Sequence, residues 1–129
     1  MRGLRTCSFV ACFLSCIGSI YAQDIRGQWS GTVVQNGPGD ERSEYAAEIS
    51  LDGEHGTIDY PSLGCGGVLL FVDQRGKASA YRERLTYGVD RCVDYGLVLV
   101  VQRGDALQWE WRFDVTAAGT LQGSPARRD

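Results

Sequence analysis

The sequence predicts an all-β domain built as an antiparallel meander. Beyond residue 22 it has no long amphipathic helical stretch, and seven or eight short runs rich in β-branched and aromatic residues are separated by Gly, Asp, Asn and Pro. We expect the meander to form a small closed or partly open barrel, because closure removes exposed strand edges. A two-sheet β-sandwich is the alternative.

The first four predicted strands span residues 27–35, 44–51, 56–60 and 68–73. Residues 36–40 end the first strand, and Asp52-Gly53 is a hairpin turn signal. Residues 61–67 are predicted to form a tight loop, because glycines on both sides of Cys65 can adopt positive φ. The apolar run 68–73 predicts a strand that is buried on both faces.

The last four predicted strands span residues 77–87, 97–102, 107–113 and 115–121. In the first of them, period-two alternation predicts one face with Ser79, Tyr81, Glu83, Leu85 and Tyr87 and another with Arg82, Arg84 and Thr86. In 107–113 the apolar positions alternate with polar ones. These patterns predict aromatic side chains that fill a core or line a cavity, namely Trp29, Tyr81, Trp109, Trp111 and Phe113.

Residues 1–22 are predicted to be a signal peptide, which would leave residues 23–129 as a single domain. Arg2 and Arg5 precede an apolar segment, residues 7–20, and Ala22 is a small residue before the expected cleavage site. The apolar segment is too short to span a membrane of roughly 20 helical residues. Because a signal peptide directs export, we expect a periplasmic or secreted protein. A buried N-terminal helix and a lipid anchor at Cys16 are the alternatives.

Two cysteines, Cys65 and Cys92, follow the predicted leader. In an exported chain they predict one disulfide, which would stabilise the fold by roughly 3–4 kcal/mol through a loop of about 28 residues. With His55 as the single histidine, the ligands are too few for a closed zinc site. We expect no metal and no cofactor.

The predicted mature chain carries 11 basic and 16 acidic residues, a net charge of −5. Apart from the terminal Arg127-Arg128, it lacks a cluster of Lys and Arg, so a nucleic-acid partner is not expected. His55 lies in a predicted turn, where a catalytic role is not expected. Nearby arginines are expected to keep the pKa values of Glu83, Asp90 and Asp94 low, which argues against acid–base catalysis.

Two motifs resemble known groups of proteins. Gly27-Gln28-Trp29 at the start of the first strand resembles the opening of lipocalin-type barrels, where the Trp closes one end. The segments 60–67, 81–88 and 90–94 (YPSLGCGG, YRERLTYG and DRCVD) are similar to a group of small exported bacterial β-domains of largely unassigned function. This similarity implies a bacterial envelope setting and the disulfide, and it brings no catalytic residues.

We therefore expect a non-catalytic binding protein of the bacterial envelope. Its partner would be another protein of the envelope or exterior, for example a lysozyme-like hydrolase that it inhibits, because a rigid loop binds at low entropic cost and an acidic surface suits a basic partner. The alternative is a lipocalin-like carrier of a small apolar ligand. The charged segments beside the disulfide form either cross-strand ion pairs or a binding surface, which would comprise Leu63, Arg82, Arg84, Asp90, Arg91 and Asp94.

Overall fold

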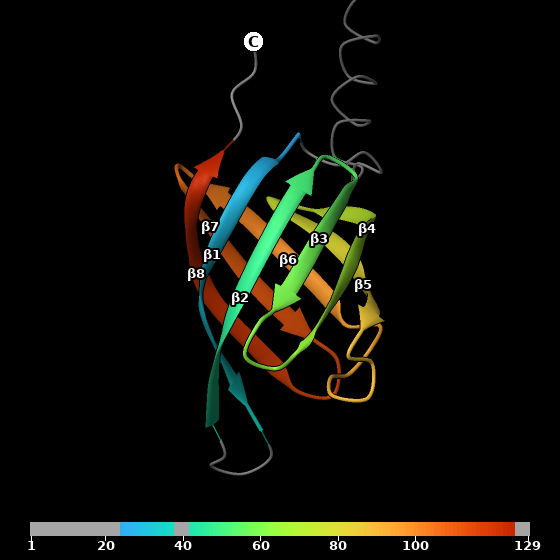
Figure 1. Cartoon of the computed structure of the whole chain (residues 1–129). Helices are drawn as coiled ribbons and strands as arrows, with labels where there is room; N and C mark the ends of the chain where they lie inside the picture. Colours follow the sequence, from blue (N-terminus) through green and yellow to red (C-terminus); the bar gives the residue numbers. More distant parts are fainter. Residues whose placement is uncertain (1–23, 38–41, 126–129) are drawn as a thin grey trace, which may run out of the picture.

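The computed structural model describes residues 24–37 and 42–125, which contain eight β-strands (Figure 1). Their bounds are β1 Arg26–Asn36, β2 Arg42–Asp52, β3 His55–Tyr60, β4 Cys65–Arg75, β5 Ala78–Tyr87, β6 Leu97–Arg103, β7 Ala106–Arg112 and β8 Thr116–Pro125. The leader predicted at residues 1–22 lies outside the described residues. Within the described ranges we find no helix with the length and apolarity that crossing a bilayer requires.

The strands form one antiparallel meander that closes into a barrel. Each strand pairs with the next along the chain, and β8 returns to pair with β1. The closing register sets Trp29 opposite Gly123 and Val34 opposite Ala118. Every strand therefore has a hydrogen-bonded neighbour on both sides. The predicted all-β meander is confirmed as a closed barrel, and the β-sandwich alternative is wrong.

Strand β4 begins at Cys65 rather than at residue 68. Its register with β5 shifts between Gly66 and Gly67, and the two strands approach each other closely at this point. A Cβ atom on Gly67 would lie 2.0 Å from the carbonyl oxygen of Arg84. Gly66 and Gly67, which suggested a loop, are thus part of a strand, where they permit this close approach of two backbones. Gly64 lies in the turn before the strand and has the positive φ that was predicted.

The barrel interior is filled by alternate residues of the strands. Four of the five aromatic residues predicted for a core or cavity are buried, with exposures of 6% or less; they are Trp29, Tyr81, Trp109 and Trp111. The fully buried aliphatic side chains around them include Val33, Ile58, Leu69, Val98, Val100, Leu107 and Leu121. The period-two pattern thus identified the inward face of most strands.

Three predictions about burial are wrong. Leu70 and Val72 are each 42% exposed, because the outer face of β4 is the outer surface of the barrel rather than an interior layer. Phe113 lies just after β7 and is 61% exposed. Tyr87 is 46% exposed, because the register shift at the start of β4 reverses the side toward which the end of β5 faces.

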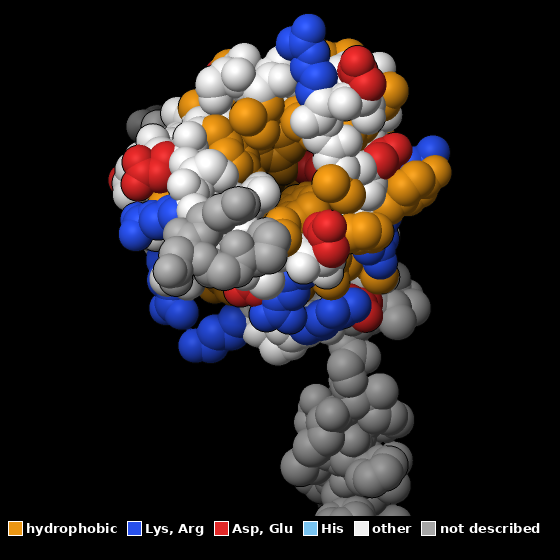
Figure 2. Space-filling view, turned by 90° about the horizontal axis from the view of Figure 1, so that it is seen from below, with side chains coloured by type: hydrophobic (Ala, Val, Ile, Leu, Met, Phe, Trp, Pro, Cys, Tyr) orange, Lys and Arg blue, Asp and Glu red, His pale blue; other side chains and the backbone are white. Residues whose placement is uncertain are grey.

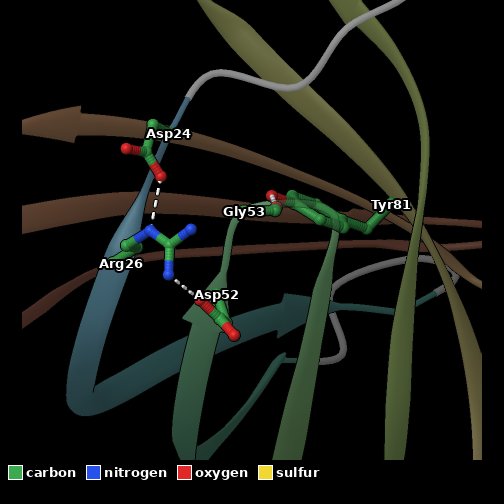
Figure 3. Close-up of polar contacts among 5 residues, drawn as sticks. All are labelled: Asp24, Arg26, Asp52, Gly53 and Tyr81. Atoms are coloured by element: carbon green, nitrogen blue, oxygen red, sulfur yellow. Dashed lines mark hydrogen bonds and ion pairs between the residues drawn. The ribbon is translucent and has the colours of Figure 1, made fainter.

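One end of the barrel is closed by contacts near the start of β1 (Figure 3). Ile25 is 2% exposed, and its carbonyl oxygen accepts a 3.0 Å hydrogen bond from the backbone N–H of Gly53 in the β2–β3 turn. The hydroxyl of Tyr81 donates a 2.6 Å bond to the Gly53 carbonyl. Arg26 forms ion pairs with Asp24 and with Asp52 on the surface of this closed end.

The disulfide lies at the opposite, open end of the barrel. Cys65 at the start of β4 is bonded to Cys92 in the β5–β6 loop, which confirms the predicted pairing. The open end is formed by the β3–β4, β5–β6 and β7–β8 connections together with the adjoining ends of β1 and β2 (Figure 1). The disulfide therefore fixes the longest of these connections, residues 88–96, to the barrel wall.

Candidate functional site

A cavity of about 260 Å³ enters the barrel from the open end. Figure 2 looks onto this end and shows a hollow bordered by hydrophobic side chains. The interior of the cavity is lined by Gln35, Tyr45, Tyr60, Glu83, Cys92, Trp111 and Val115. Its mouth is formed by exposed lining residues, which are Ser43, Glu44, Leu63, Arg91 and Val93.

The floor of the cavity contains the carboxylate of Glu83, which is only 1% exposed. Glu83 points inward because it occupies the same face of β5 as the buried residues Tyr81 and Leu85. A charged group at this depth is unusual, because Glu is almost never fully buried without a partner. Its contacts therefore determine what the cavity can bind.

Two side chains from neighbouring elements donate hydrogen bonds to Glu83. The hydroxyl of Tyr60, at the end of β3, lies 2.6 Å from Oε2, and Nε1 of Trp111, on β7, lies 3.3 Å from Oε1. The indole reaches this position because Gly96 leaves room for it. A Cβ atom on Gly96 would lie 2.0 Å from the Trp111 nitrogen. An ionised carboxylate has about four acceptor positions, so roughly half of those on Glu83 remain unused.

The pKa values of these groups are shifted upward. Burial raises the pKa of Glu83, the negative charge of Asp94 adds to the shift, and the bonds from Tyr60 and Trp111 oppose it. Burial and the charge of Glu83 raise the pKa of Tyr60 well above its usual value and that of Tyr45 to about 12. Both tyrosines therefore remain protonated, and Tyr60 remains a hydrogen-bond donor at physiological pH.

The low pKa expected for Glu83 is wrong, because the arginines beside it in sequence point outward. Arg82 donates a 2.9 Å bond to the carbonyl oxygen of Tyr95, and the guanidinium of Arg84 lies 4.5 Å from the centre of the Tyr95 ring. Asp94 accepts 2.8 Å bonds from the backbone N–H groups of Leu85 and Tyr95. These contacts tie residues 94 and 95 of the β5–β6 loop to β5.

The cross-strand ion pairs predicted beside the disulfide are absent from the described structure. Its five ion pairs join other residues. Of the six residues predicted to form a binding surface, Leu63 and Arg91 lie at the cavity mouth. Arg82, Arg84 and Asp94 contact the loop backbone or the Tyr95 ring, and Asp90 is exposed. The predicted surface is therefore divided between the mouth and the outer side of the loop.

Aromatic rings form much of the cavity wall. The rings of Tyr45 and Tyr60 pack edge to face, with centroids 5.7 Å apart, and Trp109 packs against Tyr60 from the core side at 6.3 Å. Trp111 is the one residue of the predicted aromatic set that lines the cavity, and Phe113 lies beside it at 6.4 Å. Tyr45, Tyr60 and Glu83 were absent from the predicted set.

Glu83 could have been identified from the sequence. It is a carboxylate on the face of a strand whose neighbouring positions, Tyr81 and Leu85, are large and apolar. A charge on an inward face is a recognised sign of a functional site. No comparable signal marks Tyr45, because an aromatic residue in a strand is ordinary core material.

The polar groups of the cavity suit recognition of an organic ligand better than metal binding. Within residues 24–37 and 42–125, no group of three or more His, Cys, Asp or Glu side chains is arranged to hold a metal ion. The cavity offers a buried carboxylate, a phenol hydroxyl and aromatic walls. Ligand sites commonly combine apolar walls with a few such polar groups.

Comparison with known proteins identified no relative of this chain. No family model matches it, and no curated protein or solved structure matches it significantly. The segments 60–67, 81–88 and 90–94 contribute Tyr60, Leu63, Glu83, Arg91, Cys92 and Val93 to this cavity.

Proposed function

We propose that this chain is a binding protein that holds a small organic ligand in the cavity at the open end of its barrel. The observation that carries the proposal is a 260 Å³ cavity whose aromatic and aliphatic walls enclose a buried, hydrogen-bonded carboxylate. A solid core would have no need of such a group, because burying a charge costs several kcal/mol. A functional site can retain it.

The size of the cavity limits the ligand. Pockets for drug-sized molecules have volumes of about 300–1,000 Å³, and this one is slightly smaller. A ligand with one or two rings would fit. This function corresponds to the lipocalin-like carrier, and the expected signal peptide would direct it to the periplasm or the exterior.

Binding of an envelope protein is the second candidate function. Several large apolar side chains are exposed around the open end (Figure 2), namely Leu63, Val89, Val93, Tyr95 and Phe113. Exposed apolar clusters of this kind are typical of protein interfaces. An inhibitor of a basic hydrolase would use this rim, and the negative charge of the chain would support such a partner.

A fluorescence titration with 2-naphthol tests the carrier function. Val93→Trp would obstruct the mouth, and Val89→Trp in the same loop is the matched control, because Val89 is 59% exposed and does not line the cavity. We expect 2-naphthol to bind the unaltered chain and the V89W variant, and V93W to weaken binding at least tenfold. Equal affinity in all three proteins would refute the proposal.

A further inference from the structure

We propose that the cavity selects ligands that carry a primary ammonium group on a small apolar body, with the ammonium bound to the carboxylate of Glu83. This inference rests on the proposed ligand-binding function and specifies the chemical class of the ligand. It would make the protein a receptor or carrier that prefers hydrophobic amines to neutral apolar molecules.

The carboxylate of Glu83 has unused hydrogen-bonding capacity. Tyr60 and Trp111 occupy one acceptor position on each carboxylate oxygen. The remaining positions need N–H or O–H donors. A primary ammonium group supplies three donors and a full positive charge, and charge-assisted bonds are about twice as strong as neutral ones.

No cation balances the charge of Glu83 within the described residues. Their ion pairs do not include Glu83. The charge on the β5–β6 loop that acts on Glu83 belongs to Asp94, which is also negative. Among the described residues, Arg91 is the one basic residue that lines the cavity, and it lies at the mouth. A buried carboxylate without a cationic partner is stabilised by any cation that reaches it.

The walls of the cavity are aromatic and aliphatic side chains that suit an ammonium on an apolar body. Tyr45, Tyr60 and Trp111 surround the carboxylate with aromatic rings, and the faces of such rings attract ammonium groups. Val93 and Val115 supply aliphatic contacts for the body of the ligand. The same walls, together with Glu83 and with Glu44 at the mouth, disfavour an anion.

The test uses three probes that share a phenylethyl body and differ in the terminal group. They are 2-phenylethylammonium, 2-phenylethanol and 3-phenylpropanoate, and their affinities are measured by calorimetry at pH 8. We expect the ammonium to bind at least tenfold more tightly than the alcohol, and the carboxylate to bind most weakly. An alcohol that binds as tightly as the ammonium would overturn the inference and leave the ligand-binding function intact.

Two matched variants assign the selectivity to Glu83. Glu83→Gln removes the buried charge and keeps the shape, and Glu48→Gln makes the same change in charge on the exposed face of β2, outside the cavity. We expect E83Q to abolish the preference for the ammonium and E48Q to preserve it. Selectivity that survives in E83Q, or disappears in E48Q, would contradict the assignment to Glu83.

The pH dependence of the unaltered chain provides an independent measurement if E83Q does not fold. The titratable or charged groups that face Glu83 are Tyr45, Tyr60 and Asp94, with Glu44 and Arg91 at the mouth. The ratio of ammonium affinity to alcohol affinity should rise with pH as Glu83 ionises, because the amine remains charged throughout. A ratio that is constant from pH 4, below the ordinary pKa of Glu, to pH 9 would refute the inference. Failure of 2-naphthol and of all three probes would instead refute the ligand-binding function.

Discussion

The hydroxyl of Tyr60 lies 2.6 Å from the carboxylate of Glu83, and both groups are buried inside the barrel. Tyr60 ends β3 and Glu83 lies in β5, so β4 separates the strands that carry them. The bond therefore spans the inside of three neighbouring strands. It ties the floor of the cavity to the β3–β4 turn at its mouth.

Removing this hydroxyl should destabilise the protein. Tyr60→Phe deprives a buried carboxylate of a donor, and we expect a loss of about 1.5–3 kcal/mol in the free energy of unfolding. Tyr87→Phe is the control, because the Tyr87 hydroxyl bonds to Asp59 at the surface. Urea denaturation at pH 7 measures both variants. Equal losses in the two would show that burial of the Tyr60–Glu83 bond has no special value.

The stability of the protein should depend on pH through Glu83. Its pKa is raised in the folded state, so the folded chain binds more protons than the unfolded chain between the ordinary pKa of Glu, about 4.3, and the raised value. The contribution of Glu83 to the free energy of unfolding therefore falls as pH rises through this window, by at most about 1.4 kcal/mol per pH unit.

Urea denaturation of the E83Q variant over a range of pH isolates this contribution. The difference in unfolding free energy between E83Q and the unaltered protein should shift in favour of E83Q as pH rises. The E48Q variant should show no such shift, because Glu48 is exposed. A pH-independent difference for E83Q would mean that burial does not raise the pKa of Glu83.

Enlarging Gly96 should disturb the cavity floor. Gly96→Ala places a methyl group where the Trp111 indole lies, and overpacking of this kind costs about 1–3 kcal/mol. The indole should move away from Glu83, and ammonium selectivity should change with it. The emission spectrum of Trp111, recorded with Trp29 and Trp109 replaced by Phe in both proteins, measures the movement. An unchanged spectrum would show that a methyl group at position 96 does not displace the indole of Trp111.

Reducing the disulfide should weaken both the fold and the site. The Cys65–Cys92 bond is expected to contribute roughly 3–4 kcal/mol to the free energy of unfolding. It also holds Cys92 and Val93 against the cavity. We therefore expect reduced protein to unfold at lower urea concentration and to bind 2-naphthol more weakly. Reduced protein that remains folded with unaltered affinity would show that the loop keeps its position without the bond.

The strands were largely predictable from the sequence because their period-two pattern is strong. Leu107, Trp109 and Trp111 alternate with polar residues and all three face inward. The same pattern failed at Phe113, where the chain leaves the strand and the backbone N–H of Phe113 bonds to the carbonyl of Val115 instead. A local pattern does not indicate the residue at which strand pairing ends.

The cavity was less predictable, because it depends on contacts between distant strands. Alternation placed Glu83 on the inward face, yet the neighbouring Arg82 and Arg84 suggested surface ion pairs. Only the register of β3, β4 and β5 brings Tyr60 to the carboxylate. That register includes the shift at Gly66 and Gly67, which is a property of the paired strands and not of either segment alone.

The pairing of β1 with β8 also determines the end of the barrel at which the protein can be linked to a support without covering the cavity. Gly27 of β1 lies opposite Pro125 of β8, so the described chain enters and leaves the barrel at the same end. The cavity opens at the other end (Figure 2). A surface linkage made directly at residue 24 or residue 125 would leave the mouth of the cavity directed away from the support and accessible from solution.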